Sequence, residues 1–323
     1  MAELAELLHY LTVALAVAVS SIGAGIGEGL ASHAAIKAIN KQPGARSDIS
    51  KTMILGTALI ETAAIMGLLI SAIMLWGSES IERTTYTGIA TLGIALAICI
   101  SGFVIGIVSA FPAQQACLAI ARQPFFAQKI VRFMLITQSI IQTPIVFSFI
   151  IAMLIKAQLT TIDSLADSFR LLGAGICIGF GSIGPSIGLA QFARTACSGL
   201  GINRDAYNKL LPFTFLSEAI IETPIIFALV VSILLLVTGI PNGNLLVGIA
   251  MLFAGFCTGF GTIGAGISSG KTSSAACHQI ALAPEKYSLL ARVSMFSQGL
   301  IDTCAIYALL ISLLLIITSR YMV

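Results

Sequence analysis

The chain of 323 residues is 57% hydrophobic and only 10% charged, with a mean hydropathy of +1.01. A soluble domain carries roughly 25% charged residues, so this chain lacks the charge to cover a globular surface, and lipid must cover it instead. The net charge of +3 excludes the basic footprint of a nucleic-acid-binding protein. Composition therefore predicts an integral membrane protein in contact with the lipid bilayer and not with nucleic acid.

Taken in chain order, the apolar stretches predict transmembrane helices, since most reach or approach the ~20 residues that a helix needs to cross a bilayer. The eight expected helices are 7–40, 47–76, 86–121, 127–157, 166–200, 205–239, 244–282 and 286–319. Short polar segments join them in pairs. The predicted fold class is an all-α membrane protein of four tandem transmembrane hairpins.

The predicted hairpins are copies of one sequence unit. Each second helix carries a polar residue inside an apolar span, in "ALIETAAIMGLL", "SIIQTPIVFSFI", "AIIETPIIFALV" and "GLIDTCAIYALL". The aligned polar residues, spaced 81, 80 and 80 apart, are Glu61, Gln142, Glu222 and Asp302. This repeat divides the chain into the units 1–80, 81–160, 161–242 and 243–323.

Three of the aligned residues are acids inside apolar helices. An acid at the bilayer centre costs at least about 2.5–3.5 kcal/mol on insertion scales, so Glu61, Glu222 and Asp302 need a functional reason. An apolar setting favours the protonated or cation-paired carboxyl, whereas a nearby fixed positive charge favours the ionised one. We therefore interpret the three acids as reversible ion carriers. The alternative is a permanently protonated carboxyl that bridges two helices, a role that an amide or a hydroxyl fills at lower cost.

Further polar residues surround the carrier positions. A threonine follows each carrier position, and one turn earlier lie Thr57, Gln138, Glu218 and Gln298, on the same helix face. Possible ion-coordinating residues are Glu28, Thr62, Glu218, Thr223, Gln298 and Thr303. The alternative for the residues one turn earlier is that they only make hydrogen bonds between helices. Pro144 and Pro224, two residues after the carrier position, are expected to kink or loosen the helix.

The first helices are rich in glycine. Gly23, Gly25, Gly27 and Gly29 alternate along the first of them, and "GSIGPSIGLA" and "GTIGAGISSG" repeat part of this row. Small residues let helix backbones approach closely in lipid, where no hydrophobic force drives association. The repetition predicts that the first helices form the inner, closely packed row of a concentric arrangement.

Loop charges predict the orientation. The segments inside the hairpins carry most of the lysines and arginines, whereas the opposite side has only Arg83, Lys156, Arg170 and Arg320. That opposite side also carries Glu3, Glu6, Glu79, Glu82, Asp163 and Asp167. The positive-inside rule therefore predicts cytoplasmic hairpin loops and both termini outside.

The combined motifs "SIGAGIGEG", "KQP" or "RQP" and "ALIETAAIMGLLISAIML" resemble the c subunit of F-type ATP synthases, here as four hairpins in tandem. The resemblance covers essentially all four hairpins and implies a non-catalytic subunit whose copies form a rotor ring, with each chain as one arc. It implies that Glu61, Glu222 and Asp302 exchange ions with the stator subunit a. It also implies that the loop residues face the central stalk subunits gamma and epsilon: Lys41, Gln42, Pro43, Arg122, Gln123 and Pro124. A bacterial cell membrane is the expected location, and the transported ion takes the place of a cofactor.

Gln142 departs from this family pattern because an amide does not ionise. Ser109 occupies the place of Glu28 in the same hairpin. An amide imitates the hydrogen bonds of a neutral carboxyl without loading an ion. The second hairpin is therefore expected to be an inactive spacer, so that the ring moves three ions per four hairpins.

The identity of the ion stays open between proton and sodium. Sodium needs several oxygen ligands, and Glu28 with Glu61 and Thr62 offers a small cation cage. Glu218 beside Glu222 forms a second carboxylate pair, of which one member must be protonated. Ser269 and Leu189 at the Glu28-equivalent position make the sites unequal. We favour the proton because it is the commoner coupling ion of the family.

Three other functions compete with the F-type rotor. Proteolipids of vacuolar or archaeal rotary ATPases are commonly fused hairpins, and the fusion favours that type, while the "KQP" and "RQP" loops favour the F-type. A repeat-built secondary transporter predicts broken helices around one central cavity. A purely structural membrane oligomer does not explain the buried acids.

Overall fold

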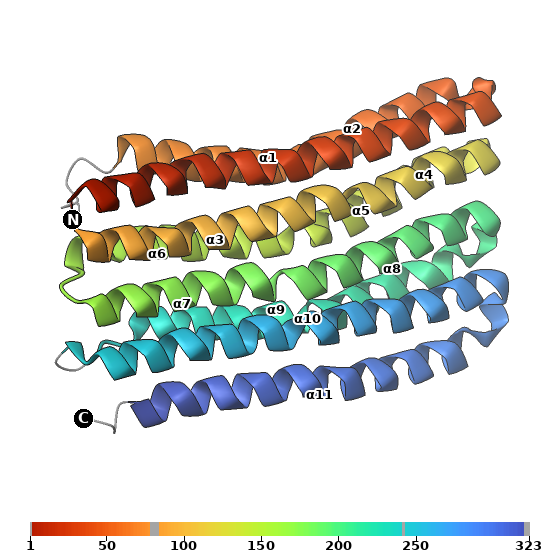
Figure 1. The fold of residues 1–323 in the computed structure, drawn as a ribbon. Helices are drawn as coiled ribbons and strands as arrows, with labels where there is room; N and C mark the ends of the chain where they lie inside the picture. Colours follow the sequence, from red (N-terminus) through yellow and green to blue (C-terminus); the bar gives the residue numbers. More distant parts are fainter. Residues whose placement is uncertain (1, 78–83, 241–242, 320–323) are drawn as a thin grey trace.

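The computed structural model describes residues 2–77, 84–240 and 243–319, and the regular structure of these residues is helical. Four helix pairs lie side by side in chain order (Figure 1). The first pair is α1 (Ala2–Lys41) and α2 (Arg46–Trp76). The second combines α3 (Thr85–Val108) and α4 (Ala110–Arg122) with α5 (Ala127–Ile141) and α6 (Thr143–Gln158). The third joins α7 (Leu165–Gly181) and α8 (Ile183–Ile202) to α9 (Tyr207–Val237), and the fourth is α10 (Leu245–Leu282) with α11 (Tyr287–Ser319).

In the described residues, eight helical stretches are long and apolar enough to cross a membrane. This confirms the predicted fold class of transmembrane hairpins. Each hairpin turns through a short 3₁₀ helix; these are η1 (Pro43–Ala45), η2 (Pro124–Phe126), η4 (Arg204–Ala206) and η6 (Pro284–Lys286). The 3₁₀ helix η3 (Leu159–Thr161) lies in the connection between the second and third pairs, and the predicted boundary at 160/161 falls inside it. The boundaries predicted at 80/81 and 242/243 fall on residues outside the described ranges.

The two ends of the bundle differ. The start of α1 and the end of α11 lie at one end and the turns within the hairpins at the other (Figure 1). The predicted orientation requires this arrangement, because it places the lysine- and arginine-rich turns on one side of the membrane and both termini on the other. Glu79, Glu82, Arg83 and Arg320, which contributed to the predicted orientation, lie outside the described residues.

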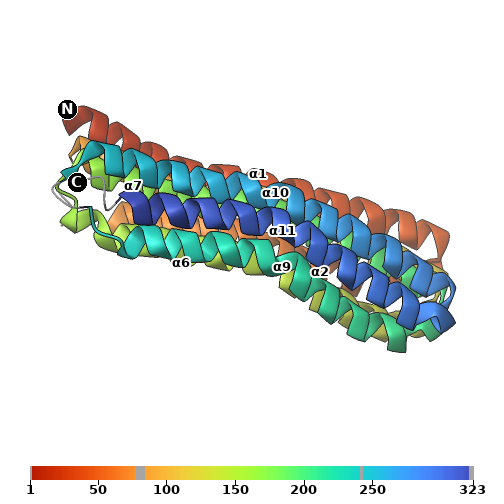
Figure 2. The same cartoon turned by 90° about the horizontal axis from the view of Figure 1, so that it is seen from below.

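Three predicted continuous helices are interrupted by a single residue. The interruptions fall at Ser109, Gln142 and Ser182. A proline follows each within three positions, as Pro112, Pro144 and Pro185, and a proline removes one backbone hydrogen bond and crowds the preceding turn. By contrast, α9 runs unbroken through Pro212 and Pro224 and bends part-way along its length (Figure 2). The first helix also begins earlier than expected, at Ala2 instead of residue 7.

The helices form two layers. The first helices (α1, α3 with α4, α7 with α8, and α10) make one layer, and the second helices make the other (Figures 1 and 2). First helices touch through glycine: a Cβ at Gly27 would collide with the backbone of Gly106, and one at Gly188 with the backbone of Gly266. Second helices touch one another much less. The first helices therefore form the closely packed layer that the glycine pattern predicted, and we expect this layer to be the inner, concave side of the arc.

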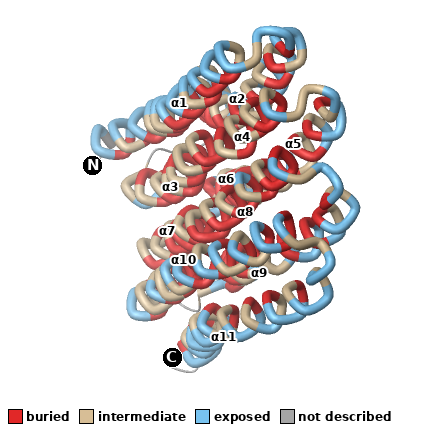
Figure 3. Tube along the Cα trace, turned by 90° about the vertical axis from the view of Figure 1, so that its right-hand side faces the viewer, coloured by how far each residue is buried: buried red, intermediate tan, exposed pale blue. Residues whose placement is uncertain are grey.

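Not every glycine of the predicted row makes such a contact. Gly25, Gly29 and Gly264 have no atom within 4 Å of an added Cβ. The first two point to the free side of the first hairpin, and Gly264 lies on the last one. Burial also differs between the middle and the outer hairpins. The middle hairpins are mostly buried, whereas α1 and α11 are widely exposed (Figure 3).

Two apolar clusters fill the bundle, one toward the hairpin turns and one toward the chain ends. Ile60, Ile141 and Ile221 belong to the first cluster, whereas Ile70 and Ile225 belong to the second. The carrier positions follow Ile60, Ile141 and Ile221 directly in the sequence. They therefore occupy the level at which the two clusters meet.

Candidate ion-binding site

The best-defined carrier position is that of Gln142, between the first and second hairpins. Its Nε2 donates to Ser109 Oγ at 2.8 Å, and the Thr62 hydroxyl lies 2.7 Å from its Oε1. The same hydroxyl lies 2.7 Å from the carbonyl oxygen of Leu59, so its one proton serves either acceptor. Gln142 is 8% exposed. Thr62 thus lies at the carrier position of the next hairpin, whereas the sequence had grouped it with Glu61.

Gln138, one turn earlier, bridges the same two hairpins. Its Nε2 donates to the carbonyl oxygen of Gly56 at 2.8 Å and approaches both the carbonyl oxygen and the hydroxyl of Ser109, at 3.1 and 3.2 Å. This is the helix-bridging alternative that the sequence had left open for this position. Its Oε1 is buried without a hydrogen-bond partner.

Asp302 lies at the equivalent place between the third and fourth hairpins, where it is 7% exposed. The Ser269 hydroxyl donates to its Oδ1 over 3.4 Å. Gln298 turns its Nε2 to the carbonyl and hydroxyl of Ser294, and its buried Oε1 has no partner. The hydroxyl of Thr223 donates to the carbonyl oxygen of Ala219 in its own helix. The acid is therefore held by a single long hydrogen bond.

Glu222 lies between the second and third hairpins and is partly exposed. The hydroxyl of Thr143 from the preceding hairpin interacts with its carboxyl. Glu218 is fully buried, and neither of its carboxyl oxygens has a hydrogen-bond partner. The two acids are near enough to interact electrostatically, as the spacing predicted. Leu189 gives this position no oxygen from the first helix.

Glu61 is exposed, because no described hairpin packs against that side of the first pair. Glu28 lies near enough to feel its charge, which brings the predicted pair together. Thr303, on the last hairpin, donates to the carbonyl oxygen of Leu300 and has no hydrogen bond to a carrier position among the described residues. The free side of the first hairpin carries the acid of a junction, and the last hairpin carries the threonine that such a junction contains.

The loop residues predicted to face a stalk divide into two groups. Lys41, Pro43 and Arg122 are exposed, whereas Gln42 and Pro124 are partly buried. Gln123 donates its amide to the carbonyl oxygen of Gly201, in the last turn of α8, over 3.4 Å. In the third loop, which lacks the motif, Asn203 makes the equivalent bond to Ala281 at 3.1 Å. Each amide therefore ties one hairpin turn to the end of the first helix of the next hairpin.

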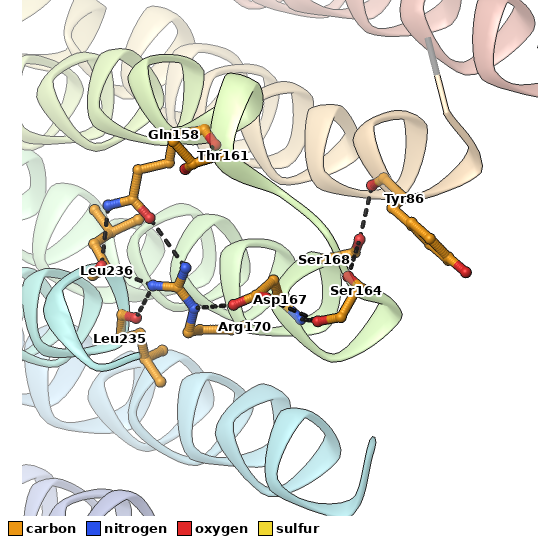
Figure 4. Close-up of polar contacts among 9 residues, drawn as sticks. All are labelled: Tyr86, Gln158, Thr161, Ser164, Asp167, Ser168, Arg170, Leu235 and Leu236. Atoms are coloured by element: carbon orange, nitrogen blue, oxygen red, sulfur yellow. Dashed lines mark hydrogen bonds and ion pairs between the residues drawn. The ribbon is translucent and has the colours of Figure 1, made fainter. Parts of the chain in front are cut away.

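Sequence reasoning missed a buried polar cluster at the end of the bundle that holds the chain ends. Arg170 Nη1 donates to the carbonyl oxygens of Leu235 and Leu236 at 2.9 and 2.7 Å, and Nη2 donates to Gln158 Oε1 at 3.1 Å (Figure 4). Its Nε lies 3.3 Å from Asp167 Oδ1. Arginine here satisfies the free carbonyls at the end of α9 and joins the second hairpin to the third. A lone arginine within an apolar helix was the available signal, but it was counted only as a topology charge.

Comparison with known proteins identifies the family to which these hairpins belong. The family profile for the ATP synthase C subunit matches three tandem stretches, 11–74, 172–235 and 252–315, which together span more than half of the chain. The chain belongs to this family. The stretches contain Glu61, Glu222 and Asp302, and the hairpin with Gln142 lies between the first and second of them.

Curated relatives correspond to one hairpin each. An ATP synthase c subunit of Cereibacter sphaeroides, numbered 2 in that organism, is 40% identical over 76 residues, which are 24% of this chain and 92% of the relative. An ATP synthase c subunit of Pelobacter propionicus, also numbered 2, is 40% identical over 68 residues, 21% of this chain and 75% of the relative. The ATP synthase c subunit of a Synechococcus strain is 36% identical over 78 residues, 24% of this chain and 95% of the relative.

This ATP synthase c subunit is thus a multi-pass integral membrane protein and a non-catalytic rotor component. Membership in the family gives it an ion-translocating role in a ring within the ATP synthase complex.

Proposed function

We propose that this rotor protein carries protons on Glu61, Glu222 and Asp302 and that Gln142 carries none. Each turn of the ring then moves three protons for every four hairpins. The observation on which this rests is the contrast between a closed, non-ionisable Gln142 junction and carboxyls that are held by few bonds or by none.

The proton is favoured because the oxygen groups beside the carboxyl differ among the three acidic positions. Glu61 has Glu28 beside it, Glu222 has Glu218 and Thr143, and Asp302 has Ser269. A coupling ion must load at all three positions in turn. Sodium requires several oxygen ligands in a suitable arrangement, as hard cations do, whereas a proton requires one carboxylate oxygen.

The hydrogen bonds of Gln142 support its role as a spacer. Its amide reaches Ser109 and Thr62 at once, so the position is satisfied without an ion. A neutral residue with satisfied polar groups crosses lipid at little cost, because no charge has to be desolvated.

Copies of the chain join head to tail in our proposal. The open glycines Gly25 and Gly29 face the free side of the first hairpin, and Gly264 is the equivalent of Gly184, which packs on the next hairpin. A heterologous contact of this kind closes a ring when the rotation closes. In such a ring, Thr303 of one copy lies beside Glu61 of the next copy, in the same way that Thr62 lies beside Gln142 within this chain.

The other partners follow from the family. We propose a stator subunit a that exchanges protons with the carboxyls, and central stalk subunits gamma and epsilon at the hairpin turns, in an F-type machine of a bacterial cell membrane with these turns in the cytoplasm. Phe125 at the tip of the second turn is fully exposed beside Arg122, which suits a protein contact. Purification of the intact complex with these subunits bound supports the F-type assignment, and recovery with vacuolar-type stalk subunits contradicts it.

Carbodiimide labelling tests the proposal, since the reagent modifies protonated carboxyls in apolar settings. We expect mass spectrometry of the purified ring to find the label on Glu61, Glu222 and Asp302 and none on Gln142 peptides. Labelling should fall as pH rises and should not change with sodium at constant ionic strength. Protection of Glu61 and Glu222 by sodium would overturn the proton assignment, and an unlabelled Asp302 would overturn the count of carriers.

A further inference from the structure

A basic cleft lies between two first helices, on the side away from the second helices. It has a volume of about 320 Å³ and is lined by Gln191, Arg194 and Thr195 of α8 and Lys271 and Ser274 of α10. The lining contains no residue of a second helix. The cleft therefore opens on the concave face of the arc, which is the interior of the ring.

Both cations of the cleft lack an acidic partner. Neither α8 nor α10 contains an aspartate or glutamate, and no ion pair joins Arg194 or Lys271 to an acid within the described residues. The only close aromatic neighbour described for Arg194 is the ring of Phe111 in α4, 5.7 Å from its guanidinium carbon. Two exposed like charges beside one cleft repel unless an anion lies between them. Arginine favours phosphate for this role, because its planar fork matches two phosphate oxygens.

An apolar surface continues from the cleft toward the end that holds the chain termini. The rings of Phe180 and Phe260, on neighbouring first helices, lie 4.6 Å apart, and Phe256 stacks on Phe260. Residues 11 apart on one helix lie on nearly the same face, so Phe260 faces the same side of α10 as Lys271, and Phe180 lies against Phe260. At 1.5 Å per residue, Phe260 lies about 16 Å from Lys271 along α10, toward the end of the bundle that holds the chain termini.

These distances correspond to an amphiphile. One leaflet of bilayer hydrocarbon is about 15 Å thick, which matches the separation between Lys271 and Phe260 along α10. A free phosphate ion fills the cleft but leaves the apolar surface beneath it uncovered. A neutral phospholipid covers the surface but leaves a net positive charge.

We infer that the cleft of Arg194 and Lys271 binds the phosphate of an anionic phospholipid, whose acyl chains lie along Phe180 and Phe260 inside the ring. Gln191 supplies a further donor, since its amide has no other hydrogen bond described. The hydroxyls of Thr195 and Ser274 already donate to carbonyls of their own helices. The inference rests on the ring arrangement and not on the identity of the transported ion.

The test uses intact rings reconstituted in nanodiscs of phosphatidylglycerol with phosphatidylcholine, then extracted and assayed for retained lipid. The wild-type ring should retain phosphatidylglycerol selectively. The double variant R194Q/K271Q should retain at least about tenfold less, because two charge-assisted contacts are lost. The matched control is K51Q/R132Q, which removes two cations from a cleft on the second helices that also contains Asp48. The control should retain phosphatidylglycerol as the wild type does.

Three outcomes would overturn the inference: equal retention of phosphatidylcholine, equal retention by R194Q/K271Q, or full displacement of the lipid by millimolar inorganic phosphate. A second measurement does not depend on the assembly of the variant. A photoreactive phosphatidylglycerol in wild-type rings should label peptides of α8 and α10, and labelling confined to the second helices would contradict the site. Carbodiimide labelling of R194Q/K271Q separates this inference from the proposed function, since lipid loss should leave that labelling unchanged.

Discussion

The Gln142 and Asp302 junctions use the same parts with different results. Each combines a serine on the first helix, a glutamine one turn before the carrier position and a threonine on the preceding hairpin. Gln142 closes its junction with short contacts to Ser109 and Thr62, whereas Asp302 receives one bond of 3.4 Å from Ser269. The side chain of aspartate is one carbon shorter than that of glutamine. Length and charge at one position thus separate a junction closed by short contacts from one held by a single long hydrogen bond.

The largest expected effect comes from making a carrier position resemble Gln142. The substitution Glu222→Gln places two neutral hairpins in succession and should lower ATP-driven proton transport about tenfold or more, because the ionisable group on the membrane path is lost. Acidification of inverted vesicles measures the effect. Gln142→Asn serves as the control and should leave transport near the wild-type level. Undiminished transport by the Glu222→Gln ring would show that this acid is not a carrier.

The reverse change tests the spacer directly. Gln142→Glu adds a carboxyl at the fourth equivalent position, so the ions moved per chain should rise from three to four, an increase of about one third. The ion-to-ATP ratio at thermodynamic equilibrium measures it, together with carbodiimide labelling of residue 142. A labelled residue with an unchanged ratio would contradict the proposed role of Gln142.

A smaller effect, on stability, should follow from removing the hydroxyl of Ser109, which both Gln138 and Gln142 contact. Ser109→Ala removes the hydroxyl partner of Gln142 Nε2, and a buried donor left unpaired costs about 1–3 kcal/mol. Thermal dissociation of the ring measures the loss. Ser101→Ala is the matched control, because the Ser101 hydroxyl bonds only to carbonyls of its own helix. Equal losses in the two variants would argue against the closed Gln142 junction.

The smallest effect separates two threonines. Thr62→Val should destabilise the ring by about 1 kcal/mol, since one neutral hydrogen bond to Gln142 is lost. Thr223→Val should change stability less, because the Thr223 hydroxyl bonds within its own helix. The same thermal measurement compares them. A larger loss from Thr223→Val would show that the junctions are more alike than their hydrogen bonds indicate.

Much of the fold was predictable because membrane helices obey local rules. Apolar length identified the eight spans, and the 80-residue repeat aligned the polar residues. The breaks at Ser109 and Ser182 were not predicted, although Pro112 and Pro185 were visible in the sequence. Pro224 shows why, since α9 passes through it without interruption. Whether a proline breaks a helix depends on the neighbours that accept its freed carbonyls.

The sequence predicted which residue types form the site, but it did not predict which of them contact one another across hairpins. Spacing along one helix brought Glu218 to Glu222, but Thr62 lies with Gln142 of the next hairpin, and Gln123 bonds to Gly201. These partners are about 80 residues apart, and no local periodicity links them. Arg170 likewise found its carbonyl partners only through packing.

By itself, the sequence determined the number of membrane-spanning hairpins, the positions of their acids and the exceptional amide at 142, because hydropathy and repetition are properties of the chain alone. Only the tertiary structure decided which groups meet across hairpins, which glycines remain open and where the basic cleft of Arg194 and Lys271 lies. The physical reason is that contacts between hairpins depend on how closely helix backbones approach, and that distance is set by packing in three dimensions.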